Sequence, residues 1–152
     1  YGGMAGRDMN ALSVGLHEVT DGHYLGNRIE QVKYLGDRLI KWNIPVQKPI
    51  GGHAVFIDAT KFLKNVAKEE YIAQTLAMEL YLEAGVRGVE VGTLLADRDP
   101  ITKENRYPKL EMLRLAIPRR TYTNNHMNVV AVALKNIFDR RDKIKTGFKI
   151  IR

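Results

Sequence analysis

Residues 113–127, LRLAIPRRTYTNNHM, decide the fold class because they combine a strand pattern, a turn and the start of a helix. The stretch begins with apolar strand residues and reaches a turn that carries two arginines. A polar segment, Thr123-Asn124-Asn125, then precedes apolar residues at helical spacing: Met127, Val130, Ala131, Leu134, Ile137 and Phe138. The pattern predicts a strand joined through a short turn to a helix with one apolar face.

Arg114 lies inside the strand pattern, between two leucines. A guanidinium in such a position needs an anionic partner, because an unpaired buried charge costs too much free energy. The partner is either a structural Asp or Glu or a ligand carboxylate, which arginine binds through two parallel hydrogen bonds. From the strand alone, a structural ion pair is the favoured interpretation. Arg119 and Arg120 are interpreted as turn or surface arginines.

Periodicity, turn residues and capping residues predict the other elements. Helices are expected at residues 8–19, 22–42, 60–66, 69–84 and 123–143. Strands are expected at residues 54–58, 86–91 and 110–117, with a possible last strand at 148–151. This order predicts an α+β domain, a mainly antiparallel sheet with helices packed on one face.

Composition excludes several classes of protein. The chain has 152 residues, of which 45% are apolar and 27% charged, as in a globular domain with its own core. No run approaches the roughly 18 apolar residues of a membrane helix, so no membrane partner is expected. The absence of cysteine excludes disulfides and thiolate metal ligands and fits a cytoplasmic protein. The histidines lack zinc-ligand spacing, so no metal is expected.

The net charge is +7, and much of it comes from the end of the chain. Residues 135–152 contain seven Lys or Arg and two Asp. A basic tail of this kind can bind nucleic acid. Here the charges alternate with Asp139 and Asp142, as on a solvated helix face, and no aromatic stacking platform accompanies them. Nucleic acid is therefore not an expected partner.

Five strings in order resemble one enzyme family. They are YGGMAGRDM at residues 1–9, QVKYLGDRL at 31–39, GGHAVFIDA at 51–59, GVRGVEVG at 85–92 and PKLEMLRLAIPRRTYTNNHM at 108–127. Together they resemble the C-terminal part of the tryptophanases and tyrosine phenol-lyases, which are pyridoxal-phosphate-dependent β-eliminating lyases. Any one string would be a weak signal, but five in register cover nearly the whole chain.

The resemblance implies the small domain of the aspartate-aminotransferase-type pyridoxal-phosphate fold. Residues 1–42 would be a helical connection from a large cofactor-binding domain, and residues 43–152 the small C-terminal domain. The cofactor that the resemblance implies is pyridoxal 5'-phosphate, and its lysine would lie outside this chain. The sequence is thus interpreted as a fragment of a carbon–carbon lyase, inactive alone, whose partners would be the remainder of the same polypeptide and other copies in a dimer or tetramer.

The resemblance also assigns residues. Arg114 would bind the α-carboxylate of the substrate. Val91 stands where tyrosine phenol-lyases have an arginine that contacts the phenol oxygen, and Val89 lies beside it, so both are candidates for aromatic-ring specificity. The apolar side chain at position 91 favours tryptophan over tyrosine, although both valines could simply be strand core. Tyr1-Gly2-Gly3 is interpreted as an ordinary turn, with the cofactor phosphate of a neighbouring subunit as the alternative.

The expected reaction is α,β-elimination from an aromatic L-amino acid, giving indole or phenol, pyruvate and ammonia. Two alternatives remain open. One is another pyridoxal-phosphate enzyme of the same fold, a transaminase or β-lyase that uses the same arginine. The other is a stand-alone binding domain with the same fold and the basic tail.

Overall fold

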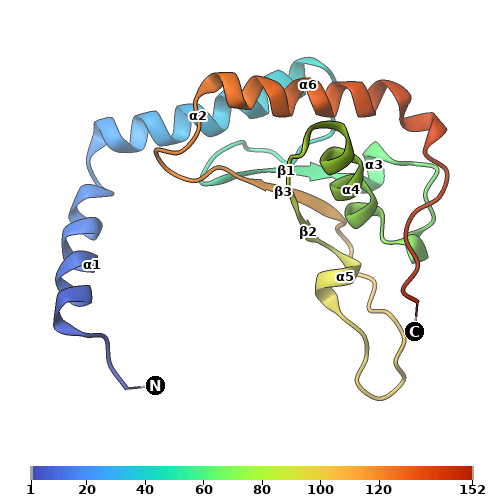
Figure 1. Ribbon diagram of the computed structural model, residues 1–152, viewed down its shortest axis with the longest axis horizontal. Coiled ribbons are helices and arrows are strands. Elements are labelled where there is room, and N and C mark those ends of the chain that lie inside the picture. Colours follow the sequence, from blue (N-terminus) through green and yellow to red (C-terminus); the bar gives the residue numbers. More distant parts are fainter. Residues whose placement is uncertain (1, 152) are drawn as a thin grey trace.

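Three antiparallel strands form the sheet on which most of the helices of this chain pack (Figure 1). The computed structural model describes residues 2–151. The strands are β1 (Ala54–Asp58), β2 (Val89–Val91) and β3 (Met112–Ala116), and β3 lies between the other two. The helices are α1 (Gly6–Glu18), α2 (Gly22–Lys41), α3 (Ala59–Phe62), α4 (Ile72–Ala84), α5 (Thr93–Ala96) and α6 (Asn124–Arg140), with 3₁₀ turns η1 (Lys68–Glu70) and η2 (Arg141–Lys143).

Helices α2, α4 and α6 cover one face of this sheet, which confirms the expected α+β arrangement. In β3, Leu113 and Leu115 are buried while Arg114 between them is only half-buried. Successive side chains of a strand point to opposite faces, so the two leucines join the core with Val55 and Ile57 of β1. The helices contribute Val32, Leu35, Leu39, Leu76, Leu80, Leu134 and Ile137 to the same core.

The two N-terminal helices differ in how they are held. Asp21 caps α2, because its carboxylate accepts a hydrogen bond from the Tyr24 N–H at 2.8 Å. One stripe of α2 is fully buried, and α2 lies beside α6 along the sheet (Figure 1). Helix α1 contains no buried residue and extends away from the sheet. The core therefore starts with α2.

Most expected elements are present, with shorter bounds. The strands expected at 86–91 and 110–117 shrink to β2 and β3, and the helix expected at 60–66 ends at Phe62. Gly85 ends α4 in the left-handed region, at φ 65°, as a C-cap glycine should. The strand expected at 148–151 is wrong for the described residues. The Phe148 N–H bonds to the carbonyl of Glu70 and Gly147 N–H to its carboxylate, so a 3₁₀ turn, not a sheet edge, receives this segment.

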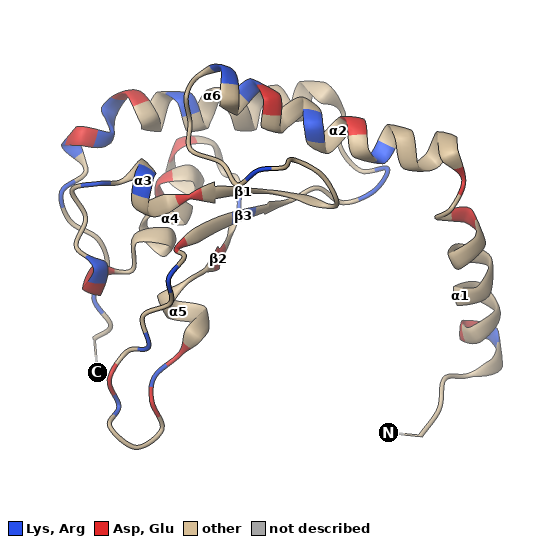
Figure 2. Ribbon diagram, turned by 180° about the vertical axis from the view of Figure 1, so that it is seen from behind, with Lys and Arg blue, Asp and Glu red and all other residues tan. Residues whose placement is uncertain are grey.

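The charges of the last helix are largely paired within the domain. Arg140 joins α6 to α4 through Glu79 at 2.8 Å and Glu83 at 3.2 Å. Lys135 pairs with Asp139 one turn along α6. Figure 2 shows acidic and basic residues interspersed along α2 and α6. Within residues 2–151, no helix is both long and apolar enough to cross a bilayer.

Two buried carboxylates hold the turn from β2 into α5. Glu111 is 3% exposed and accepts hydrogen bonds from the backbone N–H and the hydroxyl of Thr93. Glu90 is 7% exposed and accepts from Leu94 N–H at 3.0 Å and Leu95 N–H at 2.9 Å. These carboxylates satisfy the first N–H groups of α5, a helix too short to be stable alone.

A close contact between α2 and the loop before β1 gives a test of packing. A Cβ on Gly36 would lie 2.7 Å from Ile50 Cγ2, whereas a Cβ on Gly26 in the same helix would meet nothing within 4 Å. We expect Gly36→Ala to lower the free energy of unfolding by about 1–3 kcal/mol through overpacking. Gly26→Ala should raise it by about 0.5–1 kcal/mol through helix propensity. Denaturant unfolding of both variants checks this, and equal effects would contradict the contact.

Glu90 gives a test of pH dependence. Burial raises the pKa of Glu90 above its ordinary 4.5, and the nearby Glu111 adds to this, although hydrogen bonds from Leu95 and Leu94 oppose it. The folded protein then holds this proton more tightly than the unfolded chain, so this group's contribution to stability falls as pH rises above 4.5. We expect the Tm of the wild type to fall relative to that of Glu90→Gln between about pH 4 and pH 7. A Tm difference that does not change with pH would contradict this.

Candidate functional site

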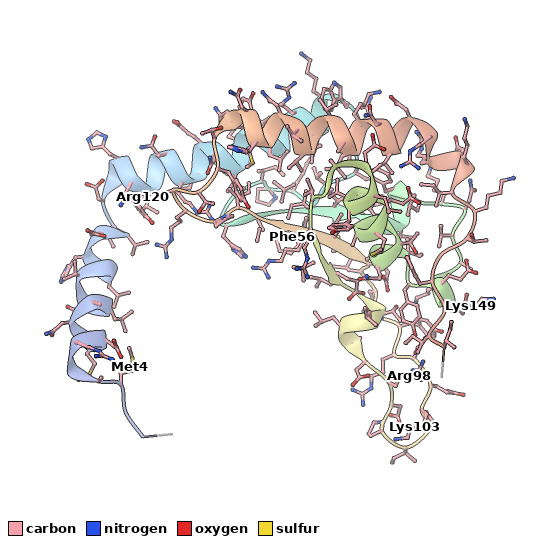
Figure 3. All side chains as sticks on the ribbon, in the orientation of Figure 1. Met4, Phe56, Arg98, Lys103, Arg120 and Lys149 are labelled. Carbon is pink, nitrogen blue, oxygen red and sulfur yellow. The ribbon has the colours of Figure 1, made fainter. Side chains whose placement is uncertain are left out.

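The face of the sheet that α2, α4 and α6 leave uncovered brings together all three residues singled out in the sequence. The antiparallel register places Phe56 of β1 and Val89 of β2 directly opposite Arg114 of β3. Val91 lies two residues along β2, opposite Met112, and therefore on the same face. Arg114, Val89 and Val91 thus share one surface, which we call the open sheet face. Figure 3 shows Phe56, the fourth member of this surface, on the sheet.

Arg114 is held without a carboxylate. Its side chain is half-buried, and its Nη2 lies 3.1 Å from Nε2 of His53. The Nε atom is buried and has no hydrogen-bond partner among the described residues. No ion pair joins Arg114 to any Asp or Glu within residues 2–151. The structural ion pair favoured from the strand pattern is therefore not found in this part of the chain.

His53 is the residue that sequence reasoning left out. It follows Gly51-Gly52 at the turn before β1, and its ring packs edge-on to Phe56 with centroids 6.5 Å apart. Its carbonyl accepts hydrogen bonds from Ile117 N–H at 2.9 Å and from Arg28 Nη2 at 3.2 Å. An arginine N–H can only donate, so the contact with Arg114 is a hydrogen bond when Nε2 carries no proton. No pattern in the sequence identified His53, because its contact with Arg114 depends on the pairing of β1 with β3.

Val89 and Val91 are presented by the edge strand of the sheet. Val89 is 48% exposed and Val91 is half-buried, so neither belongs to the hydrophobic core. Behind them, Glu90 points to the other side of β2 and, with Glu111, fixes the turn into α5. The open sheet face therefore combines one guanidinium with apolar and aromatic neighbours. Chemically, it suits a ligand with a carboxylate at one end and an apolar group at the other.

The same residues do not suit covalent attachment of a carbonyl cofactor. The strands AVFID, VEV and MLRLA contain no lysine, so they offer the open sheet face no amine. No group of three or more His, Cys, Asp or Glu within residues 2–151 could hold a metal ion. Tyr1, which belongs to the turn considered near a cofactor phosphate, lies outside the described residues. The site seen here is thus a candidate for substrate binding only.

Comparison with known proteins identifies the family to which this sequence is similar. The family model described as "Beta-eliminating lyase" matches residues 5–133. A probable beta-eliminating lyase of Trichomonas vaginalis is 65% identical over 150 residues, which are 99% of this chain and 33% of that protein. Tyrosine phenol-lyases of Symbiobacterium sp. and Intrasporangium calvum are 50% and 54% identical, over 99% and 95% of this chain and 33% and 30% of their own lengths.

This chain therefore spans about a third of the length of these relatives. The family model covers far more than half of the chain, and the matched range contains all three strands, the open sheet face and the start of α6. The chain belongs to the beta-eliminating lyase family.

Proposed function

We propose that the full-length protein carrying this sequence is a pyridoxal-phosphate-dependent carbon–carbon lyase that performs α,β-elimination on an aromatic L-amino acid. Arg114 binds the α-carboxylate of the substrate, and the open sheet face contacts its aromatic side chain. The observation that carries this proposal is a half-buried guanidinium with a buried, unpartnered Nε and no carboxylate pair among the described residues. A substrate carboxylate would supply the missing anion.

Orientation is the contribution that Arg114 makes to the reaction. Two parallel hydrogen bonds to a carboxylate fix both the position and the plane of the amino acid, which lowers the entropic part of the barrier. Pyridoxal phosphate, held by a lysine elsewhere in the polypeptide, supplies the electron sink for the chemistry. His53 contacts the side of the guanidinium at Nη2 and so restricts its rotation. Within this part of the protein, the task is therefore to hold and align the substrate.

The domain organisation is part of the same proposal. Residues 43–152 form the small domain of an aspartate-aminotransferase-type fold, and residues 1–42 connect it to a large cofactor-binding domain. The exposed α1, which has no buried residue, supports a connecting role for that helix. Helix α2 also packs into the core of the small domain, so the connection and the domain share this helix. The full-length protein is proposed to act as a cytoplasmic homodimer or tetramer.

The choice between tryptophan and tyrosine rests on two observations that point in different directions. The apolar Val91 on the open sheet face favours an indole. The relatives from Symbiobacterium and Intrasporangium are named tyrosine phenol-lyases, so the names of the relatives do not support the preference for tryptophan. We therefore propose an aromatic L-amino acid as substrate, with tyrosine and tryptophan to be compared directly.

Two other functions remain as alternatives: a different pyridoxal-phosphate enzyme that uses the same arginine, and a binding domain that has no such reaction. A transaminase or a different β-lyase of this fold would bind the same carboxylate but would not release phenol or indole together with pyruvate. A stand-alone binding domain would occur in a protein without cofactor. The visible absorbance of bound pyridoxal phosphate in the full-length protein separates the enzymes from the binding domain, and pyruvate release from an aromatic amino acid identifies the lyase.

The first functional prediction concerns Arg114. In the full-length protein, we expect Arg114→Ala to lower kcat/KM on the order of a hundredfold or more, because about 3 kcal/mol is lost with a charge-assisted bidentate contact. The visible absorbance of the bound cofactor should not change. Arg114→Lys should restore activity only in part, since lysine cannot form the two parallel bonds. Near-normal turnover by the alanine variant would show that Arg114 is structural, and Arg87→Ala is the control at an exposed arginine.

The second functional prediction concerns the preference between tyrosine and tryptophan as substrate. If Val91 contacts the aromatic ring, Val91→Arg should depress the reaction of tryptophan, because a guanidinium would face an apolar ring without a partner. The same donor can bond a phenol oxygen, so the ratio of kcat/KM for tyrosine to that for tryptophan should rise by at least about tenfold. Val132→Arg places the same charge at an exposed site on α6 and should leave the ratio unchanged. An unchanged ratio in Val91→Arg would mean that Val91 does not contact the substrate.

A further inference from the structure

A concave site lies between α2 and the connection from β3 to α6. The pocket has a volume of about 700 Å³, within the range of small-molecule sites. Helix α2 contributes Tyr24 and Arg28, and the connection contributes Arg119 and Arg120. Figure 3 shows Arg120 on this connection, next to α2 and remote from the 97–108 loop that carries Lys103. We call these lining residues the arginine pocket.

The three guanidiniums of the arginine pocket gather around one tyrosine. Arg119 Nη1 donates to the Tyr24 hydroxyl at 2.8 Å. The guanidinium carbons of Arg119 and Arg120 lie 5.9 and 5.2 Å from the centre of the Tyr24 ring, within the range of cation–π contact. Arg28 lies one helical turn after Tyr24 on α2, and its Nη1 is buried without a hydrogen-bond partner among the described residues. The cluster therefore contains guanidinium N–H groups that form no hydrogen bond with the described residues.

Like charges are held together here at an energetic cost. Burial lowers the pKa of Arg28, and repulsion from the Arg119 guanidinium lowers it further. Asp21 and Glu30 also line the pocket, but within residues 2–151 no ion pair joins either of them to these arginines. The Asp21 carboxylate instead caps α2. An anion in the pocket would relieve the repulsion and satisfy the free N–H groups.

Helix α6 reinforces the positive potential at this place. The pocket includes Thr123, the N-cap residue of α6, and Asn124, its first residue. The N-terminal end of a helix of 17 residues carries a partial positive charge and attracts anions. His126 accepts a hydrogen bond from the Thr123 N–H through Nδ1, so no acidic side chain caps this end. The helix end and the arginines thus face the same pocket.

We propose that the arginine pocket is an oxyanion-binding site, separate from the open sheet face, that takes a phosphate or carboxylate group. The group is supplied either by a small molecule that carries it or by an acidic side chain from another part of the full-length polypeptide. Arg119 and Arg120 bind the group, and Arg28, which also lines the pocket, adds its positive charge. The site is distinct from Arg114, which does not line the pocket and contacts the ring of His53, whereas Arg28 contacts the carbonyl of that residue.

The test uses the full-length protein with inorganic phosphate as the probe. Phosphate binding is measured by calorimetry at low ionic strength, and Tm is measured in the same buffer without phosphate. The variant is Arg119→Gln/Arg120→Gln, and Arg119→Lys/Arg120→Lys restores the charge. Lys103→Gln/Arg106→Gln removes the same charge from the exposed 97–108 loop as a control. Tyr24→Phe removes the hydroxyl that Arg119 bonds but keeps both guanidiniums.

Two results would support the site and tell its sources apart. Phosphate binding that weakens by at least about tenfold in the glutamine variant, and not in the loop control, identifies a free oxyanion as ligand. The second result applies if phosphate does not bind. A Tm that falls in the glutamine variant, returns in the lysine variant and does not fall in Tyr24→Phe then identifies a carboxylate of the polypeptide as the ligand. If phosphate does not bind and Tm does not change, the proposal is wrong. Neither measurement depends on lyase activity, so failure of the proposed function would leave this test intact.

Discussion

The pairing of β3 with a neighbour on each side is the constraint on which the rest of the structure depends. Its register places Leu113 and Leu115 in the core and Arg114 opposite Phe56 and Val89. A slip of one residue would exchange the two faces, burying the guanidinium under α2 and α6 and exposing the leucines. The free energy of the core therefore also fixes the position of the arginine. The positions of the residues on the open sheet face are therefore set by hydrophobic packing on the opposite face of the sheet.

The fold was largely predictable from the sequence because its signals are local. Apolar periodicity located α2, α4 and α6, and a glycine located the end of α4. The apolar run at residues 54–58 located β1 at its observed bounds. The end of the chain was not predictable, since the pattern at 148–151 resembles a strand while its bonding partner, Glu70, lies far away in sequence. The strands expected at residues 86–91 and 110–117 were longer than the observed β2 and β3, whereas β1 was not.

Only part of the candidate site was predictable from the sequence. A charged residue within an apolar strand identified Arg114, and the resemblance to a family identified Val89 and Val91. The contact between His53 and Arg114 depends on the pairing of β1 with β3, which sequence spacing alone does not give. Arg119 and Arg120 were interpreted as turn or surface arginines. They line one pocket with Arg28 only because the fold brings the β3–α6 connection next to α2. Local patterns thus predicted the helices and strands, whereas the contacts between candidate site residues depend on how those elements pair.

The turn from β2 into α5 has a consequence for how such a site can diverge. A Cβ at Gly92 would collide with the carboxylates of both Glu90 and Glu111, so this position accepts no side chain without local rearrangement. Its neighbour Val91 points away from that buried pair, on an edge strand, and tolerates change without cost to the core. Mutations can therefore accumulate at position 91 while position 92 stays fixed. The edge strand can therefore vary at position 91 independently of the packing that holds the turn into α5.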